Sequence, residues 1–148
     1  MSQVEERLAE MGLVLSPPKV PVADYLGTKR SGNLLFVSGR VSEKRGRVST
    51  DVSQEEAKLA ARNTMLDLLA IIKADIGDLD EIISILKLQG FVNSAESFNA
   101  LPQVIDGASE LLIALYGESG RHARTATGAA ELPYGATIQL DMVVEVRG

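Results

Sequence analysis

The chain has 148 residues, of which 45% are hydrophobic, and this is enough to build one domain with a substantial core. A net charge of −5 argues against a broad nucleic-acid interface, which needs clustered lysine and arginine. The sequence lacks cysteine, which excludes disulfide bonds and thiol chemistry, and no apolar run reaches the ~18 residues of a membrane span. We expect a single domain over residues 1–148. Its expected location is cytoplasmic, because the N-terminus lacks the features of a signal peptide.

Residues 1–24 are expected to form a short helix followed by an extended cover. Ser2 and Glu5 have the spacing of a capping box, which predicts a helix over residues 2–11. Three prolines within residues 16–21 exclude a helix there and predict an extended segment.

Two long amphipathic helices are predicted over residues 53–74 and 102–116, with buried strands over residues 34–39 and 81–93. The apolar stripes of the two helices consist of Ala57, Ala61, Met65, Leu68, Leu69 and Ile72, and of Val104, Ala108, Leu111, Leu112 and Leu115. Strands and helices alternate along the chain, and both helices need a sheet face to cover. The pattern therefore predicts an α+β fold with two long helices on one face of the sheet.

The C-terminal part predicts a β-hairpin, in which a strand within residues 120–133 is followed by a tight turn and a strand over residues 136–146. The second strand alternates strictly, so that every other side chain is apolar. Its other face still carries apolar groups such as Val143. A partly apolar exposed sheet face indicates an oligomer interface.

Arg124 is the first candidate for a binding residue. In a strand it shares one face with small residues, among them Ala126 and Gly128, which leave open space beside the guanidinium. The planar fork of an arginine suits a carboxylate, and this indicates an anion anchor. The alternatives are a surface arginine, or one paired with a carboxylate such as Glu145.

Four stretches resemble the Rid family, the reactive intermediate deaminases that are also called the YjgF-like or endoribonuclease L-PSP family. They are residues 32–39 (GNLLFVSG), 90–93 (GFVN), 106–109 (DGAS) and 120–133 (GRHARTATGAAELP). The chain is most similar to the longer branch, which carries a Gly-x-His-Ala-Arg motif. The resemblance implies a chorismate-mutase-like protomer with a mixed sheet, and a homotrimer with three clefts between subunits.

The resemblance also implies roles for individual residues. Arg124 would hold the carboxylate of a 2-imino acid or its enamine tautomer, and backbone groups near Ala126 would help to place a water for attack on the C=N carbon. Tyr25 and Ser38 would contribute to the same cleft. The reaction needs no cofactor, and the expected partner is a small 2-imino or 2-keto carboxylate.

The sequence departs from the family pattern at three other positions. The family's glutamate fifteen residues after the arginine is replaced by Gln139, which can orient a water but cannot take its proton. Asp141 shares the face of Gln139, roughly 6.6–6.8 Å further along the strand, and is a candidate substitute. Asp106 stands where the family often carries asparagine, and Arg40 replaces a glutamine that usually follows Ser-Gly.

His122 is the only histidine, and two residues before Arg124 it would share that strand face. It could donate to a ligand anion or act as a neutral base. Without cysteine or a second histidine, no zinc site is expected.

Three functions follow as hypotheses. The first is an imine or enamine deaminase, and the second is a non-catalytic protein that binds a small carboxylate. The third is the RNA-cleaving or translation-inhibiting role sometimes attached to the family, which the acidic charge and the single histidine disfavour.

Overall fold

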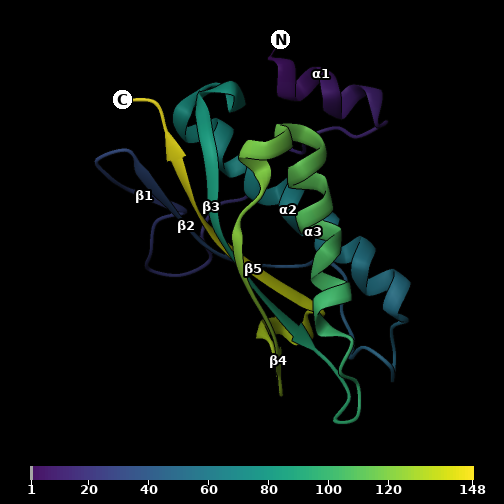
Figure 1. Ribbon diagram of the computed structural model, residues 1–148. Coiled ribbons are helices and arrows are strands. Elements are labelled where there is room, and N and C mark those ends of the chain that lie inside the picture. The colour runs from purple at the N-terminus through teal and green to yellow at the C-terminus, as the bar shows by residue number, and fades with distance from the viewer. Residues whose placement is uncertain (1) are drawn as a thin grey trace.

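The computed structural model describes residues 2–148 as a five-stranded mixed sheet with helices packed on one face (Figure 1). The helices are α1 (Gln3–Glu10), α2 (Gln54–Ile76) and α3 (Leu101–Tyr116), with 3-10 helices η1 (Leu79–Glu81), η2 (Gly117–Gly120) and η3 (Pro133–Gly135). The strands are β1 (Thr28–Ser31), β2 (Leu34–Val41), β3 (Ile82–Asn93), β4 (Ala123–Ala129) and β5 (Ile138–Val146). The predicted α+β architecture is confirmed.

The sheet has the strand order β1-β2-β5-β3-β4, so the last strand of the chain lies in its middle. β5 pairs antiparallel with both β2 and β3. Its alternation is as predicted, with one face buried under the helices. The buried residues of β5 are Ile138, Leu140, Met142, Val144 and Val146.

The predicted C-terminal hairpin is wrong, because β3 lies between β4 and β5. β4 instead pairs parallel with β3, to which α3 connects it as a crossover. The reason lies in composition. The short, small and polar residues of β4 suit a sheet edge, whereas the strictly alternating β5 supplies one apolar face for the centre.

Both long helices form as the sequence predicts. In α2, Ser53 and Glu56 form a complete capping box, and all of the predicted stripe residues of both helices are buried. The two helices pack closely where Gly107 faces the backbone of Lys58, since a Cβ at Gly107 would lie 2.0 Å from the Lys58 carbonyl oxygen. No helix within residues 2–148 is both long enough and apolar enough to cross a membrane.

The predicted first helix is present as α1, and its N-terminal N–H groups are well satisfied. The Ser2 hydroxyl accepts from the Glu5 N–H at 3.0 Å. The Asp80 carboxylate, far along the chain, accepts from the N–H groups of Gln3 and Val4 at 2.8 and 3.0 Å. Negative charge is favourable at this end of a helix, so Asp80 joins α1 to η1.

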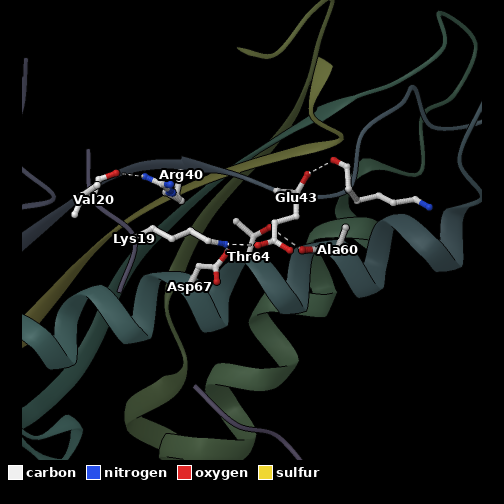
Figure 2. Close-up of polar contacts among 9 residues, drawn as sticks. Lys19, Val20, Arg40, Glu43, Ala60, Thr64 and Asp67 are labelled. Atoms are coloured by element: carbon white, nitrogen blue, oxygen red, sulfur yellow. Dashed lines mark hydrogen bonds and ion pairs between the residues drawn. The ribbon is translucent and has the colours of Figure 1, made fainter. Parts of the chain in front are cut away.

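Ion pairs and one hydrogen bond fasten the extended N-terminal segment across α2 and β2 (Figure 2). The Lys19 ammonium lies 2.6 Å from Glu43 and 2.8 Å from Asp67 on α2. The Arg40 Nη1 on β2 donates to the Val20 carbonyl at 3.0 Å. Arg40 therefore secures this segment to the sheet.

Candidate functional site

Arg124 lies on the edge strand β4 and points toward α3, which supplies its partners. Its Nη1 donates to the Asp106 carboxylate at 2.7 Å and to the Ser109 hydroxyl at 3.2 Å. Its Nη2 makes a longer contact of 3.4 Å with the Pro102 carbonyl. The arginine is thus paired with a carboxylate, as one alternative expected, but the partner is Asp106 and not Glu145.

His122 lies on the same side of the chain as Arg124 and also contacts Ser109. Its Nε2 lies 2.9 Å from the Ser109 hydroxyl oxygen, and its Nδ1 lies 2.7 Å from the Gly120 carbonyl oxygen. Gly120 lets the chain before His122 lie directly against α3, because a Cβ there would lie 2.3 Å from the Leu112 carbonyl oxygen. Ser109 therefore links the histidine to the arginine.

A shallow pocket of about 210 Å³ opens beside these groups. It is lined by Ser109, Ile113, Arg121, His122 and Arg124. The Arg121 side chain is well exposed, and its Nε lies 4.0 Å from the Glu118 carboxylate. The pocket thus combines two cations, one hydroxyl and one imidazole over an apolar side chain, which suits a small anion with a polar reacting group.

Tyr25 and Ser38 lie together near β2, three strands away from Arg124 on β4. With Arg40 and Ile71 of α2 they line a narrow cavity, in which the Ser38 hydroxyl donates to the Leu26 carbonyl. β5 and β3 lie between β2 and β4, and three strand spacings amount to about 14 Å. A single chain therefore does not bring Tyr25 and Ser38 to Arg124.

Gln139 and Asp141 lie on the open face of the sheet, opposite to the helices. The Gln139 amide packs beside Gly39, where a Cβ would lie 3.2 Å from its nitrogen. Burial raises the pKa of the Asp141 carboxyl above its usual range, and the Lys87 ammonium partly offsets this rise. Because Arg124 points toward α3, neither residue lies beside it in one chain.

Ala126 continues the strand beyond Arg124 and pairs with Gly90 of β3. Its half-buried side chain packs against the core. Asp106, in contrast, is placed directly at the candidate site. Of the residues predicted from the sequence, the structure thus brings Arg124, Asp106 and His122 together.

Ser109 was not among the residues predicted for the site. The signal was present, because Asp106 and Ser109 stand three residues apart and share one face of a helix. A serine among the buried positions of an apolar helix needs a polar partner. His122 and Arg124, two residues apart at the start of a strand, supply those partners.

Comparison with known proteins places the chain within one family. Residues 7–146 match the family described as "YjgF/chorismate mutase-like, putative endoribonuclease". Protein TCP17 of Trypanosoma cruzi is 35% identical over 97% of this chain and 94% of its own length. The crystal structure of Atu1372 from Agrobacterium tumefaciens, a protein of unknown function, is 39% identical with a TM-score of 0.92 over 98% of this chain and 93% of that one.

A second solved structure agrees over its full length. It comes from Shewanella oneidensis, is described as a "putative endoribonuclease", and is 28% identical with a TM-score of 0.94 over 98% of this chain and 100% of that one. The matched residues include both long helices and every strand. The chain therefore belongs to the YjgF/chorismate mutase-like family, as its Gly-x-His-Ala-Arg motif indicated.

Proposed function

We propose that the protein binds small 2-imino or 2-keto carboxylates at Arg124 and hydrolyses the imines slowly to keto acids and ammonia. The observation that supports this is the orientation of the guanidinium. Nη1 is held by Asp106 and Ser109, whereas within residues 2–148 Nε has no partner and Nη2 has only the long contact to Pro102. An arginine fixed at one nitrogen keeps its Nε–Nη2 edge for a bidentate carboxylate.

Hydrolysis of the imine requires from the protein mainly that it positions the substrate and a water. A carboxylate held by Arg124 fixes the adjacent C=N carbon, and a water attacks that carbon while a nearby group takes its proton. Gln139 can orient a water but cannot accept the proton, so turnover is slow. The replacement of a proton-accepting group by Gln139 also supports the second candidate, a non-catalytic protein that binds small carboxylates. An endoribonuclease activity, which the description of the Shewanella protein names, gains no support from a net charge of −5.

We further propose that the complete cleft forms in a homotrimer, where Tyr25, Ser38 and Gln139 of one copy approach Arg124 of the next. The separation of these residues within one chain supports the proposal, and so does the open sheet face. That face exposes Phe36 to 46% and carries the half-buried Val143 beside it. Apolar side chains on an otherwise uncovered sheet favour association.

The variant Phe36→Asp is expected to dissociate the trimer, because a charge in the middle of an apolar interface remains desolvated and unpaired. Sedimentation equilibrium should give three times the 15.8 kDa of one chain for the wild type and a monomer for the variant. The matched control is Leu59→Asp, since Leu59 is 48% exposed and lies on α2, on the helix side of the sheet. A wild type that stays monomeric across micromolar concentrations contradicts the trimer.

The function itself is tested by two measurements on the purified wild type. Calorimetry with pyruvate or 2-oxobutyrate measures carboxylate binding, and hydrolysis of 2-iminopropionate or 2-iminobutyrate, followed with and without protein, measures turnover. The expected result is that the protein binds the keto acid and increases the rate of imine hydrolysis only weakly. Binding without acceleration supports the non-catalytic carboxylate-binding function, and the absence of both contradicts the proposal.

A further inference from the structure

The hydrogen bonds of His122 define its tautomer. The Gly120 carbonyl can only accept, so the 2.7 Å contact requires a proton on Nδ1. In the neutral imidazole Nε2 is then the unprotonated nitrogen, and its lone pair accepts the Ser109 hydroxyl proton at 2.9 Å. The histidine is thus oriented as a base whose proton-accepting nitrogen faces a hydroxyl.

Ser109 has a second contact that fits it for proton transfer. While its hydroxyl donates to His122, its oxygen accepts from Arg124 Nη1 at 3.2 Å. A cation beside a hydroxyl oxygen stabilises negative charge that develops there. Ser109 also lines the pocket beside Arg124, so a molecule bound to the arginine lies next to this hydroxyl.

We propose that Ser109 and His122 form a proton relay that supplies the base missing at Gln139. This inference rests on the proposed function, because it concerns the hydrolysis of an imine whose carboxylate Arg124 holds. The water hydrogen-bonds to Ser109, and Ser109 passes a proton to Nε2 of His122. A base oriented by a third group is the arrangement used for activation in many hydrolytic sites.

The proton and electron balance of the step is complete. The substrate is the protonated imine: the water oxygen attacks the C=N carbon, and the C=N electron pair moves onto nitrogen, which becomes a neutral amine. The water gives one proton to the Ser109 oxygen as the serine proton moves to Nε2, and this forms a carbinolamine and an imidazolium. The imidazolium returns its proton along the same path to the amine nitrogen. The C–N bond then breaks while the carbinolamine hydroxyl gives its proton back through Ser109 to Nε2, so ammonia and a keto acid are released and the imidazolium loses that proton to ammonia or solvent.

Several charged groups lie around the imidazole. Arg124 on β4 and Arg121 before it line the same pocket, and Asp106 on α3 is paired with Arg124. The Glu118 carboxylate on η2 lies 4.0 Å from Arg121 Nε. An imidazole ordinarily titrates between about pH 5 and 8, which is the window for the test.

The test compares wild type with His122→Gln, Ser109→Ala and Ser109→Thr in imine hydrolysis from pH 5 to 9, after subtraction of the reaction without protein. Glutamine keeps an acceptor for the serine but cannot take a proton, so kcat should fall about a hundredfold with KM within about threefold. Wild-type kcat should fall with decreasing pH as the imidazole is protonated, and the His122→Gln profile should be flat. Ser109→Ala should resemble His122→Gln, whereas Ser109→Thr should restore most of the rate.

The matched control is Ser119→Ala, whose hydroxyl donates to the Tyr116 carbonyl outside the relay and whose rate should equal wild type. Because the chain has one histidine, nitrogen-15 NMR reads its tautomer directly, and the Nδ1–H form is expected. An Nε2–H tautomer, or acceleration that His122→Gln leaves unchanged, overturns the relay alone. A wild type that binds pyruvate without accelerating hydrolysis overturns both the relay and the deaminase proposal.

Discussion

Arg124→Ala is expected to weaken the binding of pyruvate or 2-oxobutyrate by about ten- to a hundredfold, which calorimetry measures directly. A charge-assisted hydrogen-bonded pair contributes about 1.5–3 kcal/mol, and the substitution removes both prongs of the fork. Arg124→Lys should restore only part of the affinity, because an ammonium cannot reproduce the bidentate geometry.

Removal of Arg124 also leaves Asp106 without its partner, and that carboxylate would itself repel an anionic ligand. The double variant Arg124→Ala, Asp106→Asn separates the two effects, since any loss that remains belongs to the arginine. Arg147→Ala, at an exposed arginine beyond β5, is the matched control and should bind as wild type does. Affinity unchanged in Arg124→Ala would show that the anion is held elsewhere.

Gly107→Ala is expected to destabilise the protein by about 3 kcal/mol, despite the higher helix propensity of alanine. The new Cβ would lie 2.0 Å from the Lys58 carbonyl oxygen, and the backbone there cannot move aside as a side chain can. For a chain of this size the melting temperature should fall by roughly 6–12 °C.

Thermal and urea unfolding measure this effect, with Gly128→Ala on β4 as the control. The nearest atom to a Cβ at Gly128 is 3.5 Å away, an ordinary contact, so its stability should change by less than about 1 kcal/mol. Equal stabilities for the two variants would mean that α2 and α3 can separate without cost. The close packing at Gly107 would then not matter to the fold.

The helices and the central strand could be predicted because their information is local. The Ser53–Glu56 capping box and the apolar stripes determine α2 and α3, and alternation determines which face of β5 is buried. The position of β4 could not be read in the same way. Strand neighbours depend on where α3 returns the chain, and a short turn between two strands wrongly indicated a hairpin.

The candidate site likewise has a part that the local sequence predicts and a part that depends on the fold. Arg124 and His122 were predictable from one strand, because residues two apart share a face. Their contacts with Asp106 and Ser109 depend on how α3 lies across β4, which no local pattern encodes. Likewise, the wide separation of Ser38 from Arg124 follows from strand order alone.

The central position of β5 has a consequence for synthesis of the chain. β5 follows the other four strands in the chain, yet it bridges β2 and β3, so the nascent chain cannot close its sheet until β5 has left the ribosome. Until then the edges of β2 and β3 that will receive it stay unpaired, and unpaired edges invite pairing with other chains. The sheet therefore closes only after β5 has emerged, and a message truncated before Ile138 would yield a chain that chaperones or proteases must remove.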